Sequence, residues 1–295
     1  MTTLDIALPA PRRFNQESQA LRTLRRLMRH RGALIGGGMV VSIGLAAILG
    51  PLLAPFDPAE MGVGASLSPP SPAHFFGTDT FGRDIFSRVL HGAQLSLMVG
   101  LVAVVIEATV GVLLGLIAGY YGGWIDGVLM RIIDVLLAFP GILLALAIVS
   151  VLGISLTNLM IAVGIGGIPS FARLIRGSTL TVKENLYVTV ARSIGAGDAS
   201  MITRHILPNV ASPIIVYATL RIAFAIIATS SLSFLGLGAK PPSPEWGVML
   251  SDGREFLRIA PWVTTFPGLA IMFSVMGINL LGDGLRDVLD PRLRV

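Results

Sequence analysis

Two ionisable residues lie deep inside long apolar stretches of the sequence. Glu107 is near the middle of 95–119, and Arg221 is well inside 210–237. A charged side chain in hydrocarbon costs roughly 2.5–3.5 kcal/mol on insertion scales, so each should face a protein interior or a water-filled path. Glu107 therefore indicates either contact with a solute in a pathway or a protonated carboxyl bonded to a neighbouring helix. Arg221 needs a carboxylate, backbone carbonyls or water, and we expect Glu107 to be its partner because the two lie at similar depth.

A second group of polar residues lies between positions 74 and 84, in the sequence HFFGTDTFGRD. His74, Asp79 and Asp84 are residue types that bind metal ions. The glycines and the arginine among them favour an alternative, in which turns and ion pairs shape an external loop. We therefore predict a structural network and no metal site. The residues of this network are Gly77, Thr78, Asp79, Gly82, Arg83 and Asp84.

The sequence lacks the common signatures of catalysis. Its only lysines, Lys183 and Lys240, follow valine and alanine, whereas the lysine of a Walker A phosphate-binding loop follows glycine. It contains no HExxH or GxSxG sequence, its 4 histidines are scattered, and it has no cysteine. An enzyme would need a convergent nucleophile and base. We predict no catalytic residue, no enzymatic activity and no cofactor bound by this chain.

The composition indicates the class of protein that positions these residues. Of 295 residues, 53% are hydrophobic and 13% are charged, and the mean hydropathy is +0.78. Soluble domains contain about 25% charged residues, so the sequence predicts an all-α integral membrane protein. Its arginines cluster beside apolar stretches, which explains the pI near 10.2 without a nucleic-acid partner. The N-terminus does not read as a cleavable signal peptide, because no small-residue cleavage site follows a short apolar core.

Six apolar stretches are long enough to cross about 30 Å of hydrocarbon. They cover approximately 32–56, 95–119, 131–153, 156–175, 210–237 and 263–281. The positions of the arginines place both termini and the interval 176–209 on the cytoplasmic side. Phe139-Pro140-Gly141 interrupts the third stretch and predicts a kink. Residues 1–31 are arginine-rich and predict either an amphipathic helix on the inner membrane surface or a solvated tail.

The polar interval 187–209 predicts a structure that protrudes between two spans. Its sequence, YVTVARSIGAGDASMITRHILPN, favours a short helix to about Ile194 and a second from about Ala199 to Ile206. Gly195 lies between them and permits a turn, since glycine reaches conformations that other residues avoid. Pro208 should end the second helix, because proline disfavours helical geometry in the preceding residue.

This interval resembles the EAA loop of permease subunits in binding-protein-dependent ABC importers. The glycine and the Leu-Pro pair of that pattern fall at Gly195 and at Leu207-Pro208. Thr189 and Val190 replace the glutamate and the first alanine, and Ala191 retains the second. Residues 205–209, HILPN, look like the version found in the dipeptide, oligopeptide and nickel group.

Four further segments resemble motifs of the same group, in the same order and spacing. They are 76–84 (LGTDxxGRD), 130–149 (MRxxDxxxxFPxxLLAIA), 233–247 (SFLGLGxxPPxPxWG) and 279–292 (NLLGDGLRDxLDPR). Phe76 replaces the usual leucine of the first. The resemblance covers nearly all of the chain from about 32 to 292, and it is to the C-type membrane subunit.

The resemblance implies a type I ABC importer (MetI-like) permease fold with six transmembrane helices and both termini cytoplasmic. The protein would lie in the inner or plasma membrane of a prokaryote, in contact with lipid. Its segments would be 1–31, a basic cytoplasmic segment; 32–94, the first transmembrane helix and an external loop; 95–288, the core permease domain with the coupling loop 177–209; and 289–295, a cytoplasmic tail.

The resemblance also implies partners. A second permease subunit would form a heterodimer with this one, two ATPase subunits would bind ATP and Mg, and an extracytoplasmic substrate-binding protein would dock outside. A piece from Ile194 to about Met201 would insert into a groove on the ATPase, with Arg192 and Asp198 at its rim. The residues expected to couple to the ATPases are Tyr187, Ala191, Arg192, Gly195, Asp198, His205, Leu207 and Pro208.

Two functions of other classes stay open at this point. An ATP-independent secondary transporter or channel would be favoured by ionisable residues paired across several spans, and only Glu107 and Arg221 lie deep. A structural assembly subunit would be favoured by a degenerate coupling loop, for which Thr189 is the argument. For an importer the expected cargo is a dipeptide or oligopeptide, and the alternatives are nickel complexes, glutathione or another small solute.

Overall fold

The computed structural model of the protein describes residues 25–289, and these residues are helical apart from their connecting loops and one isolated bridge between Thr78 and Asp84. Five helices are long and apolar enough to cross a membrane, and there are up to six if a bent helix pair is counted as one span. The all-α membrane fold expected from the sequence is confirmed. The long helices are α2 (Arg31–Leu53), α3 (Ile85–Tyr121), α6 (Leu156–Lys183), α9 (Leu207–Phe234) and α11 (Trp262–Leu289).

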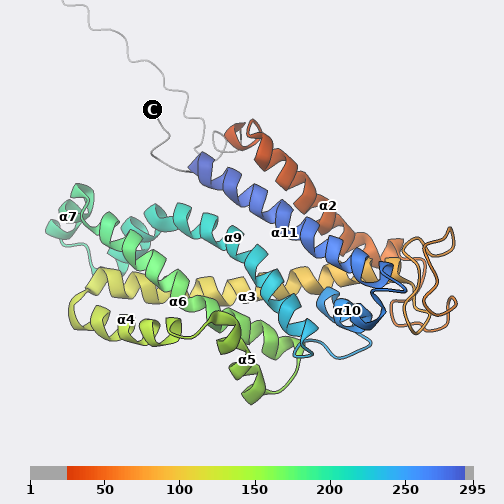
Figure 1. Cartoon of the computed structure of the whole chain (residues 1–295). Helices are drawn as coiled ribbons and strands as arrows, with labels where there is room; N and C mark the ends of the chain where they lie inside the picture. The colour runs from red at the N-terminus through yellow and green to blue at the C-terminus, as the bar shows by residue number, and fades with distance from the viewer. Residues whose placement is uncertain (1–24, 290–295) are drawn as a thin grey trace, which may run out of the picture.

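The bent pair consists of α4 (Gly123–Leu137) and α5 (Gly141–Leu152), whose axes differ by 89°. The sequence predicts a kink here, but the structure has two separate helices. Pro140 offers no N–H and disfavours helical geometry at Phe139, so the first helix ends before them and the second begins at Gly141. In Figure 1, α5 turns away from the line of α4.

The second span begins ten residues before the predicted Leu95, at Ile85. The Asp84 carboxylate accepts a hydrogen bond from the Ser87 N–H at 2.8 Å and caps the helix there. The sequence predicts an external loop up to about residue 94, because 57–94 is rich in proline and glycine. An N-cap aspartate followed by helix-compatible residues extends α3 beyond its most apolar part.

The central helix is α3, which packs most extensively on α6 and also contacts α9 and α2. Gly111, Gly115 and Gly119 recur every fourth residue on the face towards α6. A Cβ at these positions would lie 2.4–2.7 Å from the nearest atom of Phe171, Ala172 or Thr179. Small residues at this spacing let two helix backbones approach closely in a membrane.

The chain passes through Pro208 without a break, which contradicts the predicted helix end. Asp198–Phe234 forms one continuous helix made of α8 (Asp198–Ser200), the π-helical turn η1 (Met201–Ile206) and α9. The Leu207 N–H donates to the carbonyl of Ile202, five residues earlier. The wider turn changes the hydrogen-bond register just before the proline, whose missing N–H is tolerated in the first turn of α9.

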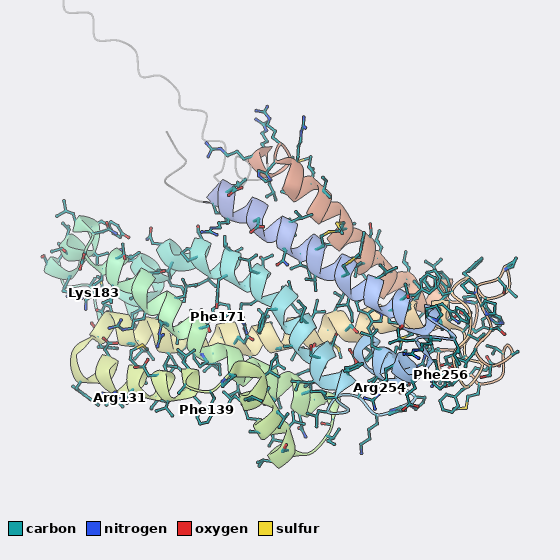
Figure 2. All side chains as sticks on the ribbon, viewed as in Figure 1. Arg131, Phe139, Phe171, Lys183, Arg254 and Phe256 are labelled. Atoms are coloured by element: carbon teal, nitrogen blue, oxygen red, sulfur yellow. The ribbon has the colours of Figure 1, made fainter. Side chains whose placement is uncertain are left out.

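The bundle has two polar ends. One carries α7 (Leu186–Ser193), and the other carries α10 (Trp246–Gly253), η2 (Arg254–Phe256) and the loop 54–84. Figure 2 shows Lys183 at the α7 end and Arg254 with Phe256 at the α10 end. The predicted amphipathic segment 1–31 and the tail 289–295 lie largely outside the described residues. The start of α2 and the end of α11 are joined by His30 and Asp287, whose side chains are 3.2 Å apart.

Candidate functional site

An ion pair between α3 and α9 lies within the bundle. The Arg221 guanidinium donates from Nε and Nη2 to the two carboxylate oxygens of Glu107, at 2.7 and 2.6 Å. The Glu107 side chain is fully buried, and that of Arg221 is 13% exposed. This confirms the partner predicted for Arg221. Such a two-bond contact fixes the geometry as well as the charge of both side chains.

A third helix, α6, packs against this ion pair and leaves room for the Glu107 carboxylate. A Cβ at Gly167 would lie 1.9 Å from the Glu107 carboxyl carbon. A Cβ at Gly164 would lie 2.9 Å from Ile106 on α3, so both glycines permit close packing of α6 on α3. Gly166 is different, since its nearest neighbour would be the Gly141 carbonyl at 3.5 Å.

Arg221 also lines a pocket of about 170 Å³ at the bend between α4 and α5. The walls are mainly apolar and come from α4, α5, α6 and α9. Figure 2 labels Phe139 at the bend. Among the lining residues are Leu136, Phe139, Ile142, Val163, Phe224 and Leu232. The polar side chains of the wall are those of Ser170 and Arg221, and the guanidinium carbon of Arg221 lies 4.4 Å from the centroid of the Phe224 ring.

The glycine turn after α7 has the predicted form. Gly195 has φ +88°, in the left-handed region that glycine occupies without strain. The Ala196 N–H donates to the Ala191 carbonyl at 3.1 Å, and the Gly195 N–H donates to the Arg192 carbonyl at 3.0 Å. This pair of bonds is the Schellman helix end. It reverses the chain between α7 and α8 within a few residues.

Tyr120, at the end of α3, connects the segments around this turn. Its hydroxyl donates to Asp198 at 2.6 Å, and its carbonyl accepts a hydrogen bond from Lys183 at the end of α6. The Arg192 guanidinium lies 5.6 Å from the centroid of its ring. The Tyr120 ring belongs to an apolar cluster whose other buried members are Leu116, Ile175, Val188, Ala191, Met201, Ile206 and Val210. The protruding segment is therefore packed against α3, α6 and α9.

The opposite side of α7 is apolar and exposed. Leu186, Val190 and Ile194 recur every fourth residue and are 78%, 51% and 81% exposed. Tyr187 lies beside them at 42%. Residues at this spacing share one face of a helix. One face of α7 thus anchors the helix, and the other presents large apolar side chains outward at the end of the bundle.

Comparison with known proteins identifies the family. A family model described as "Binding-protein-dependent transport system inner membrane component" matches residues 111–295, and one described as "N-terminal TM domain of oligopeptide transport permease C" matches residues 18–70. The chain belongs to the family of binding-protein-dependent inner-membrane transport components. It is an integral inner-membrane permease subunit of an ABC transporter, a class that is normally non-catalytic.

Curated relatives agree with this assignment. The permease is 49% identical over 270 residues to the dipeptide transport system permease protein DppC of Alkalihalophilus pseudofirmus. The aligned residues make up 92% of this chain and 89% of that relative. It is 49% identical over 271 residues to the glutathione transport system permease protein GsiD of Pectobacterium atrosepticum, with coverages of 92% and 90%. Its identity to GsiD of an Escherichia coli strain is 53% over 271 residues, with coverages of 92% and 89%.

The permease structure corrects the predicted insertion piece, Ile194 to Met201. Ile194 faces outward, but Met201 is fully buried in the cluster that contains Tyr120. Asp198 accepts the hydrogen bond from Tyr120 and is exposed, so its place at the rim of a partner groove stays a prediction. Sequence periodicity did not distinguish the two faces of α7, because apolar residues lie on both.

The other residues named for the coupling loop divide between interior and surface. Ala191 is buried and Leu207 packs against the same apolar cluster, whereas Arg192 and Pro208 are exposed and His205 is half-buried. Two ion pairs that the sequence prediction missed hold α4 on α6 near this end: Arg176 with Asp126, and Arg173 with Asp134. The members of these pairs are 50 and 39 residues apart, which gives no local signal.

At the α10 end, the predicted network of 74–84 is confirmed. His74 Nδ1 lies 3.0 Å from Asp84, and Arg83 Nε donates to Asp79 at 2.6 Å. Asp79 also accepts bonds from the N–H groups of Phe81 and Arg83 at 2.8 and 3.0 Å. Gly77 has φ +76° and Gly82 has φ +70°, and Thr78 donates to the Ala65 carbonyl at 2.6 Å. His74, Asp79 and Asp84, the residue types that suit a metal ion, are thus bonded to other groups of the protein.

Sequence reasoning missed Glu245, the N-cap residue of α10. Its carboxylate caps α10 by accepting from the N–H groups of Gly247 and Val248 at 3.0 and 2.9 Å, and it is 2% exposed. Burial raises the pKa of the Glu245 carboxyl above its ordinary value, and the two N–H donors offset part of that rise. The sequence predicts an external loop here, whereas α10 begins at Trp246, directly after Glu245.

Proposed function

We propose that this permease pairs with a second, related permease subunit around a central pathway for peptides, and that ATP hydrolysis drives import through the α7 segment. Dipeptides or oligopeptides are the proposed cargo, and glutathione is the alternative that the similarity to GsiD supports. Two ATPase subunits would bind ATP and Mg, an extracytoplasmic binding protein would deliver cargo at the α10 end, and this chain would have no enzymatic activity of its own.

The observation that carries the coupling proposal is the two-faced packing of α7. Its inner face is fixed to three spanning helices through Val188, Ala191 and the contacts of Tyr120. Its outer face presents Leu186, Val190 and Ile194. A groove on an ATPase subunit that covers these side chains would remove a large apolar area from water, at about 25 cal/mol per Å². Motion of the ATPase would then reach α3, α6 and α9 together.

This proposal places the α7 end in the cytoplasm. Arg173, Arg176, Lys183, Arg192 and Arg204 lie at or near that end, which agrees with the positive-inside rule. The alternation of spans puts the start of α2 and the end of α11 on the same side. Both chain ends would therefore be cytoplasmic.

The test is copurification of the complex from membranes in mild detergent, followed by reconstitution and uptake assays. We expect Val190→Asp with Ile194→Asp to release the ATPase subunits while the permease stays in the membrane. Thr189→Asp is the matched control, since Thr189 is exposed on the same helix but is not part of the apolar row. Uptake without ATP by this chain alone would instead support an ATP-independent transporter.

Gly195→Pro gives an independent test of the turn. Proline fixes φ near −65°, which the observed +88° excludes. We expect the variant to be inserted in the membrane and to show ATPase activity that no longer follows cargo. Complete loss of the protein would show that the turn is needed for folding rather than for coupling.

A further inference from the structure

Arg221 has one edge of its guanidinium free. Nε and Nη2 are bonded to Glu107, whereas Nη1 makes no hydrogen bond among the described residues. The guanidinium carbon lies over the Phe224 ring, 4.4 Å from its centroid. Because Glu107 is fully buried with both oxygens engaged, it offers nothing further to a solute. Of this pair, Arg221 is the residue that lines the pocket.

A second donor lines the same pocket. Ser170, on α6, makes no side-chain hydrogen bond among the described residues, although the hydroxyls of nine other helical serines donate to a carbonyl or a carboxylate of the protein. The rest of the wall is apolar apart from backbone. A pocket of mostly apolar character with a few convergent polar groups is typical of a ligand site.

The size of the pocket fits part of a small organic molecule. A water takes about 30 Å³ in the liquid, so about 170 Å³ holds roughly six waters or an organic group of comparable size. Arg recognises carboxylates through two N–H groups or through one N–H together with a neighbouring donor. The free Nη1 and the Ser170 hydroxyl are both donors, so the group they would bind together is one with two acceptor oxygens.

We propose that this pocket is a transit site for the terminal carboxylate of the cargo, which binds to Arg221 Nη1 and Ser170 Oγ while an adjoining apolar group contacts Phe139 and Phe224. The inference rests on the proposed function, because it needs cargo to pass this face. The charge of Glu107 opposes a second carboxylate, so binding at this site is weak. Weak binding suits transit, since a solute must leave a conduction site as readily as it enters.

The absence of cysteine from the chain allows a direct test. Ile142→Cys places one thiol in the pocket wall and leaves Arg221 and Ser170 in place; it is called the pocket thiol below. Ser178→Cys, on α6 and outside the pocket lining, provides the control thiol. The complete importer is reconstituted with its binding protein, and each thiol is labelled with a small neutral maleimide. The probes are dialanine and S-methylglutathione, each as the free acid and as the C-terminal carboxamide.

We expect the free acid of the transported probe to slow labelling of the pocket thiol at least fivefold, and its carboxamide to slow it less than twofold. Labelling of the control thiol should not change with either. Equal protection by acid and amide would overturn the recognition of a carboxylate. Absence of protection, or a pocket thiol that is never labelled during turnover, would overturn the site itself.

Arg221→Lys, added to the Ile142→Cys protein, tests the role of the free edge. Lysine keeps a positive charge for Glu107 but has no second planar edge. We expect the concentration of free acid that gives half-maximal protection to rise about tenfold. The same change in the Ser178→Cys protein should alter neither the labelling of the control thiol nor the copurification of the ATPases. Unchanged protection of the pocket thiol would contradict the assignment of Nη1.

These outcomes separate the two proposals. ATP-dependent uptake of a probe without protection of the pocket thiol would leave the peptide importer standing and remove the transit site. Failure of the importer to carry either probe, or uptake that does not depend on ATP, would count against the proposed function.

Discussion

Arg221 on α9 holds both carboxylate oxygens of Glu107 on α3, at 2.7 and 2.6 Å from Nε and Nη2. The two residues are 114 positions apart in the chain. Their pairing explains how two ionisable residues can lie inside an apolar bundle, because each supplies the opposite charge and the hydrogen bonds that lipid cannot offer. It also fixes α9 against α3 on the same side of the bundle as the pocket.

The pair should be far more sensitive to loss of one member than to loss of both. Arg221→Met leaves Glu107 buried without a partner, and we expect a loss of about 3–5 kcal/mol in the free energy of unfolding. Glu107→Gln combined with Arg221→Met should recover most of that loss. Thermal unfolding of the purified complex in detergent measures both variants. A double variant as unstable as the single one would show that the pair matters through packing alone.

Gly167→Ala should disrupt the same contact from the third helix. The new Cβ would lie 1.9 Å from the Glu107 carboxyl carbon, so the carboxylate must leave Arg221 or α6 must move away. We expect a loss of about 3 kcal/mol or more, because overpacking adds to the broken ion pair. Gly177→Ala, on the same helix with nothing within 4 Å, is the control and should be neutral or slightly stabilising. Equal unfolding temperatures for the two variants would disprove this account.

Tyr120→Phe should loosen the α7 segment without unfolding the bundle. The change removes the hydroxyl that donates to Asp198 at 2.6 Å and keeps the buried ring. A hydrogen bond to a charged group is worth about 1.5–3 kcal/mol. We expect hydrogen exchange of the amides in 186–206 to rise roughly tenfold or more, with little change in α3.

The neighbouring Tyr121 provides the control for this experiment. It is 49% exposed, and its hydroxyl makes no hydrogen bond among the described residues. Tyr121→Phe should leave exchange in 186–206 as it is in the unmodified protein. If both variants gave the same exchange rates, Asp198 would not anchor the segment.

Glu245 should make stability at the α10 end depend on pH. Burial raises its folded pKa above the ordinary value of 4.5, so the folded state binds the proton more tightly than the unfolded state. Its contribution to stability is therefore fully present at low pH and is lost as the pH rises above 4.5 through the raised value. Burial shifts the pKa of Asp252 in the same direction, with Arg83 and Arg88 opposing the shift.

Glu245→Gln isolates this contribution, since the variant side chain does not titrate. The measured quantity is the unfolding temperature of the unmodified complex minus that of the variant. This difference should fall as the pH is raised from 4.5, the ordinary pKa of a glutamate, to about 8. The contributions of titrating groups that both proteins share, including Asp252, cancel in the difference. A difference that stays constant with pH would mean that Glu245 keeps one protonation state throughout and acts only as a helix cap.

The sequence by itself determined the class of protein, the number of apolar stretches and the family. Hydrophobic runs of about 20 residues are a local property of the chain, and so are the glycine and proline that begin and end turns. Gly195 is an example: its left-handed conformation and the helix end around it depend on a few neighbouring residues. The motif at 74–84 is another, because the bonds of Asp79 with Arg83 and of His74 with Asp84 are made within one short segment.

Only the tertiary structure decided which faces are covered and which contacts cross between helices. The sequence suggested the partner of Arg221 from depth alone, but the room that Gly167 leaves for it depends on how α6 packs. The continuity of the helix through Pro208 depends on a π-helical turn held by the cluster of Met201 and Ile206. The outward row of α7 became visible only when Tyr120 and its neighbours covered the other face. These features arise from residues far apart in the chain, so no local pattern could specify them.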